Sequence, residues 1–182
     1  MRESKLIKMA LDFRNNAKTQ IQQIQANSDL NATAKSNQIG QLRAAANAKL
    51  AEMKKAYELE GRNLVAAAHT AAFQLGHRHS ATDLEKAVAA ESLRVAQRHA
   101  MSLPDDKAMN DFARLAASGG DKISLTALAS VAWQKGWART LQTVADGDAG
   151  LNERMGALRE AETSNSNPND QMAVSISFAQ IS

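Results

Sequence analysis

The chain has four histidines, and imidazole binds metals and transfers protons near neutral pH. His77 and His79 flank Arg78 in a predicted turn, and this i, i+2 spacing would suit two metal ligands on a strand better than in a turn. The chain has no cysteine, no third ligand accompanies the pair, and the His-Glu-x-x-His motif is absent. His69 and His99 lie alone on predicted helices. The histidines therefore predict no metal site.

A second group with chemical potential is Asp146-x-Asp148-x-Gly150, which is similar to the start of a calcium-binding loop. Such a loop needs glycine at its sixth position and glutamate at its twelfth. This chain has Leu151 and Ala157 there. A turn that ends a helix is the better interpretation.

Three carboxylates, Asp105, Asp106 and Asp111, form a cluster of the kind that acid–base catalysis uses. They fall at a predicted helix start, where capping and the helix dipole explain acidic residues. Gly119-Gly120 lacks the Lys-Ser/Thr pair of a phosphate-binding loop. We therefore expect no enzyme: no catalytic residue, no metal site, no cofactor and no small-molecule substrate.

Composition predicts long helices. Only 4% of the 182 residues are aromatic, alanine supplies much of the 44% hydrophobic content, and there are two prolines. Alanine favours helix but fills little core volume, so we expect helices that pack through thin seams in an all-α fold. No stretch approaches the roughly 20 apolar residues of a membrane span, and no secretory signal is visible. We expect a protein made in the cytoplasm, with no membrane partner.

Positive charge concentrates in the amino-terminal half. Residues 1–61 carry ten Lys/Arg against six Asp/Glu, whereas residues 102–163 carry seven against nine. A solvated helical surface is the simpler explanation, and a face that contacts DNA without sequence preference is the alternative. The candidate DNA-facing residues, interrupted by Glu52 and Glu58, are Arg43, Lys49, Lys54 and Lys55.

Residues 1–61 are predicted to form a hairpin of two long helices, with one bent coiled-coil rod as the alternative. The first helix, 2–27, has apolar residues at three- and four-residue steps: Leu6, Met9, Phe13, Ala17, Ile21 and Ile24. The polar segment 27–33 interrupts it. The second helix carries a heptad-like seam of Ile39, Leu42, Ala46, Leu50, Met53 and Tyr57.

Residues 62–163 predict an alanine-rich helical bundle. Gly61 either punctuates the second helix or only weakens it. Helices are expected over 62–75, about 82–101, about 103–118, 125–145 and 152–162. Two capping boxes mark the second of these, Ser80 with Asp83 and Thr82 with Glu85, and Ser124 is predicted to cap the fourth. Trp133 and Trp137 lie one predicted turn apart, either in the core or as an interface anchor.

Residues 164–182 predict a polar linker and then a single β-strand. Met172, Val174, Ile176 and Phe178 alternate with small or polar residues, as in a half-buried strand. A lone strand has unpaired backbone groups, so we expect it to add to a sheet of another subunit. These four residues and the two tryptophans are the candidate assembly interface.

Several segments resemble the helical structural proteins of tailed bacteriophage virions. The segments that carry the resemblance are 28–35 (Ser-Asp-Leu-Asn-Ala-Thr-Ala-Lys), 39–43, 50–53 and 125–137. The resemblance implies a structural subunit of the head or the head-to-tail connector, located in the virion and made in the host cytoplasm. Its implied partners are copies of itself and other virion proteins such as portal, capsid or tail. A scaffolding or decoration protein is the alternative within this class, and a non-specific DNA-binding protein is the alternative outside it.

Overall fold

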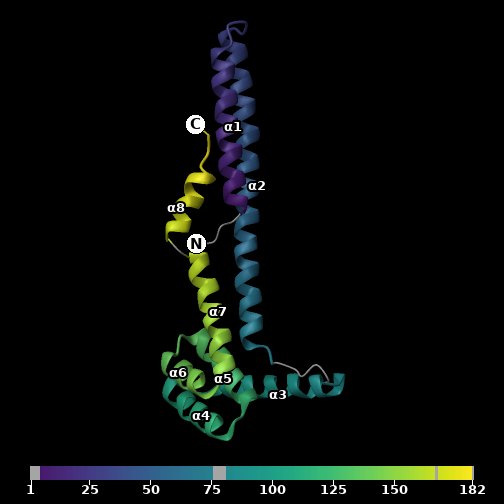
Figure 1. The fold of residues 1–182 in the computed structure, drawn as a ribbon, viewed down its shortest axis with the longest axis vertical. Coiled ribbons are helices and arrows are strands. Elements are labelled where there is room, and N and C mark those ends of the chain that lie inside the picture. The colour runs from purple at the N-terminus through teal and green to yellow at the C-terminus, as the bar shows by residue number, and fades with distance from the viewer. Residues whose placement is uncertain (1–4, 76–80, 167, 182) are drawn as a thin grey trace. The chain divides into compact units, whose positions relative to one another are not determined.

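The computed structural model describes residues 5–75, 81–166 and 168–181, and in these ranges the chain forms eight α-helices and no strand (Figure 1). The all-α prediction is confirmed. The helices group into two compact units. One comprises Met1–Val65 with Ala161–Ser182, and the other comprises Ala66–Glu160.

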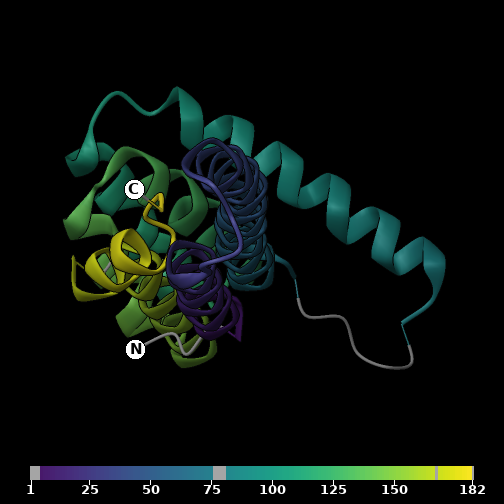
Figure 2. The ribbon, with the colours of Figure 1, turned by 90° about the horizontal axis from the view of Figure 1, so that it is seen from above.

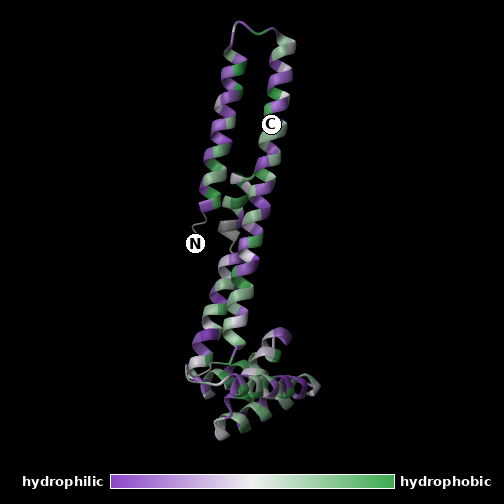
Figure 3. Cartoon of the chain, turned by 90° about the vertical axis from the view of Figure 1, so that its right-hand side faces the viewer, coloured by the Kyte–Doolittle hydropathy of each residue, from purple (hydrophilic) through white to green (hydrophobic). Residues whose placement is uncertain are grey.

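In the first unit, α1 (Lys5–Ala26) and the first part of α2 (Ala32–Phe73) form an antiparallel hairpin (Figures 1 and 3). The turn between them is held by side chains. The Asn31 carboxamide oxygen accepts from the Ala34 N–H at 2.8 Å, as a helix cap does. Lys35 Nζ donates to the Gln25 carbonyl oxygen at 2.8 Å, which ties the start of α2 to the end of α1. Of the two arrangements left open by the sequence, the structure has the hairpin.

The seam of the hairpin agrees with the prediction on α2 but only in part on α1. All six predicted α2 positions belong to the buried cluster or pack against it. On α1, Ala10, Ala17 and Ile21 are buried, whereas Met9 is 46% exposed and Phe13 is 36% exposed. Met9 and Phe13, two members of the apolar pattern of the first helix, therefore lie largely outside the seam. Alanines at the contact let two helices approach closely, and larger side chains then lie outside it.

Helix α2 continues through Gly61 to Phe73, so Gly61 does not separate two helices. A glycine inside a helix costs about 1 kcal/mol relative to alanine. The flanking sequence is rich in good helix formers, so the helix continues through this single unfavourable position.

The second unit surrounds helix α5 (Lys122–Lys135), in which residues 125–132 are all buried. Helices α3 (Asp83–Ser102), α4 (Asp106–Gly119) and α6 (Ala138–Gly147) pack against it, and α7 (Ala149–Ser166) begins in this unit. The predicted single helix 125–145 is wrong. Gly136 adopts φ +68°, in the left-handed region that glycine tolerates, and it ends α5 there.

Helices α4 and α6 are joined by polar contacts that are largely shielded from water. The Asp106 carboxylate accepts from the Thr140 N–H at 3.1 Å and from the Thr140 hydroxyl at 2.7 Å. One turn further on, the Thr143 hydroxyl donates to the Asn110 carboxamide oxygen at 2.6 Å. Asp106, a member of the predicted carboxylate cluster, therefore has a structural partner.

The predicted carboxy-terminal strand is not present. Residues Pro168–Ser177 form helix α8, with proline at the first helical position, where its missing N–H costs nothing. Four apolar residues at every second position also form two pairs spaced i, i+4. Each such pair lies on one face of a helix, so the pattern is compatible with a helix as well as with a strand. Val174 and Phe178 face inward as one pair. Met172 (66% exposed) and Ile176 (49% exposed) face outward as the other.

Candidate assembly surfaces

Helix α3 begins at the capping box that the sequence predicts at Thr82 and Glu85. The Thr82 hydroxyl accepts from the Glu85 N–H at 3.2 Å, and the Glu85 carboxylate accepts from the Thr82 N–H at 2.7 Å. The Thr82 N–H and the Thr82 hydroxyl, which donates to the same carboxylate at 2.9 Å, hold the pKa of Glu85 below its ordinary value. Ser80, of the second predicted box, lies outside the described residues. The cap starts α3 firmly although its first two turns have little core contact.

The amino-terminal half of α3 extends away from α4, α5 and α6 in both views (Figures 1 and 2). Helix α3 carries a stripe of exposed apolar side chains at helical spacing, which begins in this half and continues past the middle: Leu84 is 75% exposed, Val88 58% and Val95 51%. The opposite side of α3, which includes the buried Ala100, packs on α5. We call Leu84, Val88 and Val95 the α3 stripe. Exposed apolar residues that share a helix face are typical of a contact with another protein surface.

A shallow groove of about 640 Å³ runs beside the α3 stripe, between α3 and the start of α5. Its α3 wall includes Val88, Val95 and His99, and its α5 wall includes Ile123 and Ser124. The α5 wall is held by Asp121, which caps that helix. The Asp121 carboxylate accepts from the Ser124 N–H at 3.0 Å and from the Ser124 hydroxyl at 2.6 Å. Asp121, rather than the predicted Ser124, is therefore the capping residue.

The hydrogen bonds from Ser124 lower the pKa of Asp121 from its ordinary value. The Ser124 hydroxyl is the largest contributor, and the Ser124 and Ile123 N–H groups add to it. The α5 end of the groove therefore keeps a negative charge at neutral pH.

The two tryptophans lie on different elements. Trp133 is half-buried in α5, with its ring 6.1 Å from the Phe73 ring and the Arg159 guanidinium 5.7 Å from its centroid. Trp137 follows the break at Gly136, precedes α6, and has Lys135 Nζ 4.2 Å from its ring centroid. The structure therefore does not bring them together as one anchor, because the turn at Gly136 separates them.

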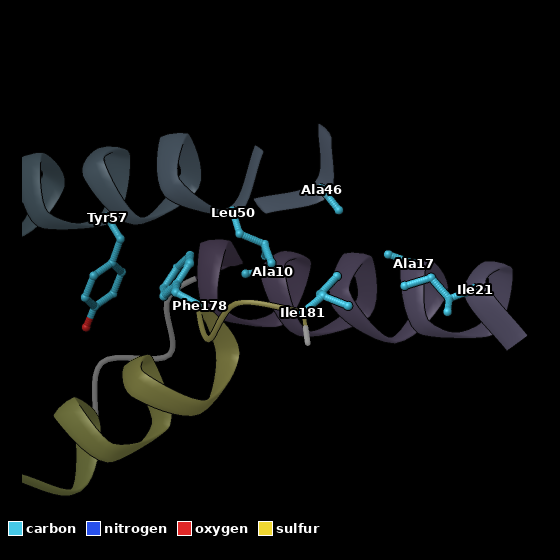
Figure 4. Close-up of a cluster of buried hydrophobic side chains, with 8 residues drawn as sticks. All are labelled: Ala10, Ala17, Ile21, Ala46, Leu50, Tyr57, Phe178 and Ile181. Atoms are coloured by element: carbon cyan, nitrogen blue, oxygen red, sulfur yellow. The ribbon is translucent and has the colours of Figure 1, made fainter. Parts of the chain in front are cut away.

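The carboxy-terminal end packs within its own unit. Phe178 and Ile181 are buried in the hairpin cluster, together with Leu50 and Tyr57 (Figure 4). The rings of Phe178 and Tyr57 lie 6.0 Å apart, and the Ile181 N–H donates to the Asn47 carboxamide oxygen at 2.8 Å. The predicted interface at this end is thus divided. Val174 and Phe178 belong to the core, and Met172 and Ile176 remain at the surface.

The four predicted DNA-facing residues lie on different sides of α2. Lys54 is three turns beyond Arg43 and on the same side of the helix, whereas Lys49 and Lys55 fall on other sides. Arg43 is half-buried along the seam. Lys49 Nζ is 3.0 Å from the Glu52 carboxylate in an exposed ion pair. A basic stripe along one face of α2 is therefore not formed by these residues.

The residues first considered for chemistry have structural surroundings. Asp148 ends α6 and its carboxylate accepts from the Leu151 N–H at 3.0 Å, which confirms a helix-terminating turn. Asp105 caps α4 through the Ala108 N–H at 2.8 Å. His69 and His99 pack edge-on against Phe73 and Phe112. His77 and His79 lie outside the described residues.

The described residues contain neither a cluster of metal ligands nor a membrane-spanning helix. No three His, Asp or Glu side chains among them lie close enough to bind one metal ion. No helix that the structure describes is both long and apolar enough to cross a membrane.

The α3 stripe was not singled out by the sequence, although a signal for it existed. Leu84, Val88 and Val95 recur at steps of four and seven residues, which places them on one helix face. The same spacing predicts a buried face, so only the fold shows that this face is exposed.

Comparisons with protein-family models, with curated proteins and with solved structures found no match to this chain.

Proposed function

We propose that this chain is a non-enzymatic structural subunit that works by assembling with other subunits through its helix surfaces. The observation that carries the proposal is the amount of large apolar surface left outside the core. Twelve large hydrophobic side chains among the described residues are exposed, and they lie on helices of both units. Side chains of this kind gain about 25 cal/mol per Å² when a partner removes them from water.

The hairpin supports the same role. Its seam is narrow, and alanines fill three of the six positions that α1 and α2 contribute to the buried cluster, so it exposes much surface for each residue that it buries. Helical rods of this kind present long faces to neighbours in an assembly. The resemblance of segments 28–35 and 125–137 to tailed-bacteriophage structural proteins makes the virion head or the head-to-tail connector the proposed setting.

Strand addition at the carboxy terminus is not part of this proposal, because Phe178 and Ile181 are buried in the chain's own hairpin. The proposed contacts are helix to helix. They involve copies of the chain and other virion proteins such as portal, capsid or tail.

The test is mass spectrometry of phage particles purified by density gradient from host cells that carry the gene. We expect the chain in mature, DNA-filled particles at a defined copy number relative to the capsid protein. A chain found in empty precursor particles and absent from filled ones would instead identify a scaffolding protein. A chain absent from both kinds of particle would contradict the proposal.

A non-specific DNA-binding role is separated by a second measurement, the retention of DNA at increasing salt. DNA binding that uses lysines and arginines weakens steeply with salt because counterions are released. An assembly contact between apolar helix faces depends on salt only weakly. Tight DNA binding that is lost between low and moderate salt would favour the DNA-binding role.

A further inference from the structure

The charges on α3 are distributed unequally between its two halves. The acidic residues lie at or before the middle of the helix, and the arginines lie after it. Asp83, Glu85 and Glu91 are on the first side, with Lys86 as the one basic residue there, and Arg94, Arg98 and His99 are on the second. Glu91 marks the boundary, and its carboxylate lies 3.3 Å from Arg94 and 3.7 Å from Arg98. The helix is thus negative at its start and positive at its end.

The α3 stripe runs through this charge gradient and is nearly symmetric about Ser92. Val88 lies four residues before Ser92 and Val95 lies three residues after it. Leu84 lies eight residues before Ser92, whereas Ala100, eight residues after it, is buried on the opposite side of α3 and does not extend the stripe. A helix with this pattern is complementary to a copy of itself that runs in the opposite direction.

We propose that two copies of the chain form a two-fold symmetric dimer in which their α3 helices pack antiparallel across Ser92. The inference rests on the proposed assembly role, since it names the surface through which copies meet. In this arrangement Val88 of one copy lies beside Val95 of the other. The acidic start of each helix faces the basic end of its partner.

Electrostatics select the antiparallel direction. A parallel pair would place Glu91 beside Glu91 and Arg98 beside Arg98, and like charges at short distance disfavour association. The antiparallel pair instead places Glu91 near Arg94, and Glu85 near Arg98, of the second copy, and these attractions outnumber the unfavourable approaches of Lys86 to Arg98 and of Glu91 to Glu91. Such an interface uses the same patch on both copies, which is the commonest symmetry of homo-oligomers.

The groove beside the stripe receives the side chains of the second copy. It is open, holds about 640 Å³, and has apolar walls from Val88, Val95 and Ile123. In the antiparallel pair centred on Ser92, the two Leu84 residues lie sixteen residues apart along the helix axis. Leu84 of the second copy therefore reaches the end of the groove that lies near His99. Burial of Leu84, the most exposed large hydrophobic residue described, provides the main apolar gain.

The first test is the mass of the purified full chain by sedimentation equilibrium. We expect a concentration-dependent dimer. Val88→Glu and Val95→Glu should each weaken it by about tenfold or more, because a charge is then placed at the centre of the apolar contact. Leu115→Glu is the matched control, since Leu115 is also exposed (66%) but lies on α4. A monomer at all concentrations, or equal weakening by the control, would overturn the proposal.

Charge exchange provides the second test. In the Glu91→Arg variant, the side chains at positions 91, 94 and 98 are all positive. In the double variant Arg94→Glu/Arg98→Glu, they are all negative. Each variant alone should be mostly monomeric. An equimolar mixture should form a heterodimer, because opposite flanks then meet. All three positions are exposed, so circular dichroism should show unchanged helix content. A mixture that stays monomeric would contradict the contact.

Thiol crosslinking tests the direction of packing, and the absence of native cysteine makes each introduced thiol unique. Ser92→Cys should crosslink to itself through a short thiol-to-thiol reagent. Leu84→Cys should not, since the two Leu84 positions are about 24 Å apart along an antiparallel pair. Efficient self-crosslinking of Leu84→Cys would indicate a parallel pair and overturn the proposal. Neither result bears on whether the chain enters a particle, so the assembly role is judged separately by the particle analysis.

Discussion

The burial of Phe178 against the hairpin makes the carboxy terminus a stabilising element of the first unit. Phe178 is 8% exposed and contacts Tyr57 of α2 at a ring distance of 6.0 Å. Ile181 continues the contact three residues later. We predict that Phe178→Ala loosens the hairpin formed by α1 and α2.

The size of the effect follows from the burial. Replacing a buried phenylalanine with alanine costs about 3–5 kcal/mol, and loss of an aromatic pair is part of that cost. Phe178 lies just past the end of α8, in a turn whose backbone can move and partly close the cavity. We therefore expect about 3 kcal/mol of lost stability in the first unit.

Amide hydrogen exchange with peptide-level mass analysis measures this change locally. Opening that is easier by about 3 kcal/mol should speed exchange in α1 by roughly a hundredfold. Exchange in α5, which belongs to the other unit, should change little. The matched control is Met172→Ala on α8, because Met172 is 66% exposed and its loss removes little buried area.

Two results would refute this reasoning. Exchange in α1 that stays within about threefold of the unmodified chain would mean that Phe178 does not hold the hairpin. Equal acceleration by Phe178→Ala and Met172→Ala would mean that burial is not the cause.

Two further predictions concern the second unit. Gly147→Ala should destabilise the chain by about 1–3 kcal/mol, because a Cβ there would lie 2.8 Å from Ala117 Cβ. Gly156→Ala in α7, where a Cβ meets nothing within 4 Å, should stabilise it by about 0.5–1 kcal/mol, and urea unfolding compares the two. Asp121→Ala should cost about 1 kcal/mol at pH 7 through loss of the α5 cap. Because folding lowers the pKa of Asp121 from 3.8, its contribution is complete above that pH and is lost as the pH falls through the lower folded value. The two chains should therefore differ less in thermal stability at pH 2 than at pH 7, and a constant difference would contradict the assignment.

Local chemistry in the sequence was sufficient where the signal involves neighbours along the chain. The capping box of Thr82 and Glu85, the helix end near Gly120 and the turn at Asp148 were all predictable, because each depends on groups within four residues. The α2 seam from Ile39 to Tyr57 was predictable because its period is sustained over several turns.

Short patterns failed where they fit two structures equally well. Four alternating apolar residues from Met172 to Phe178 satisfy a strand, and they also satisfy two i, i+4 helix pairs. A lone glycine is equally ambiguous, since Gly61 remains inside α2 whereas Gly136 adopts φ +68° and ends α5. The free energy that separates these outcomes comes from packing against distant parts of the chain.

Sequence by itself therefore determined the all-α class, the hairpin's α2 seam and the start of α3. Only the tertiary structure decided which faces are buried. Met9 and Phe13 have the apolar character of seam residues, yet Ala10 and Ala17 occupy the seam. Leu84, Val88 and Val95 have the spacing of a core face, yet they are exposed. Burial is a property of how elements far apart in the chain meet, and periodicity within one helix identifies an apolar face without naming what covers it.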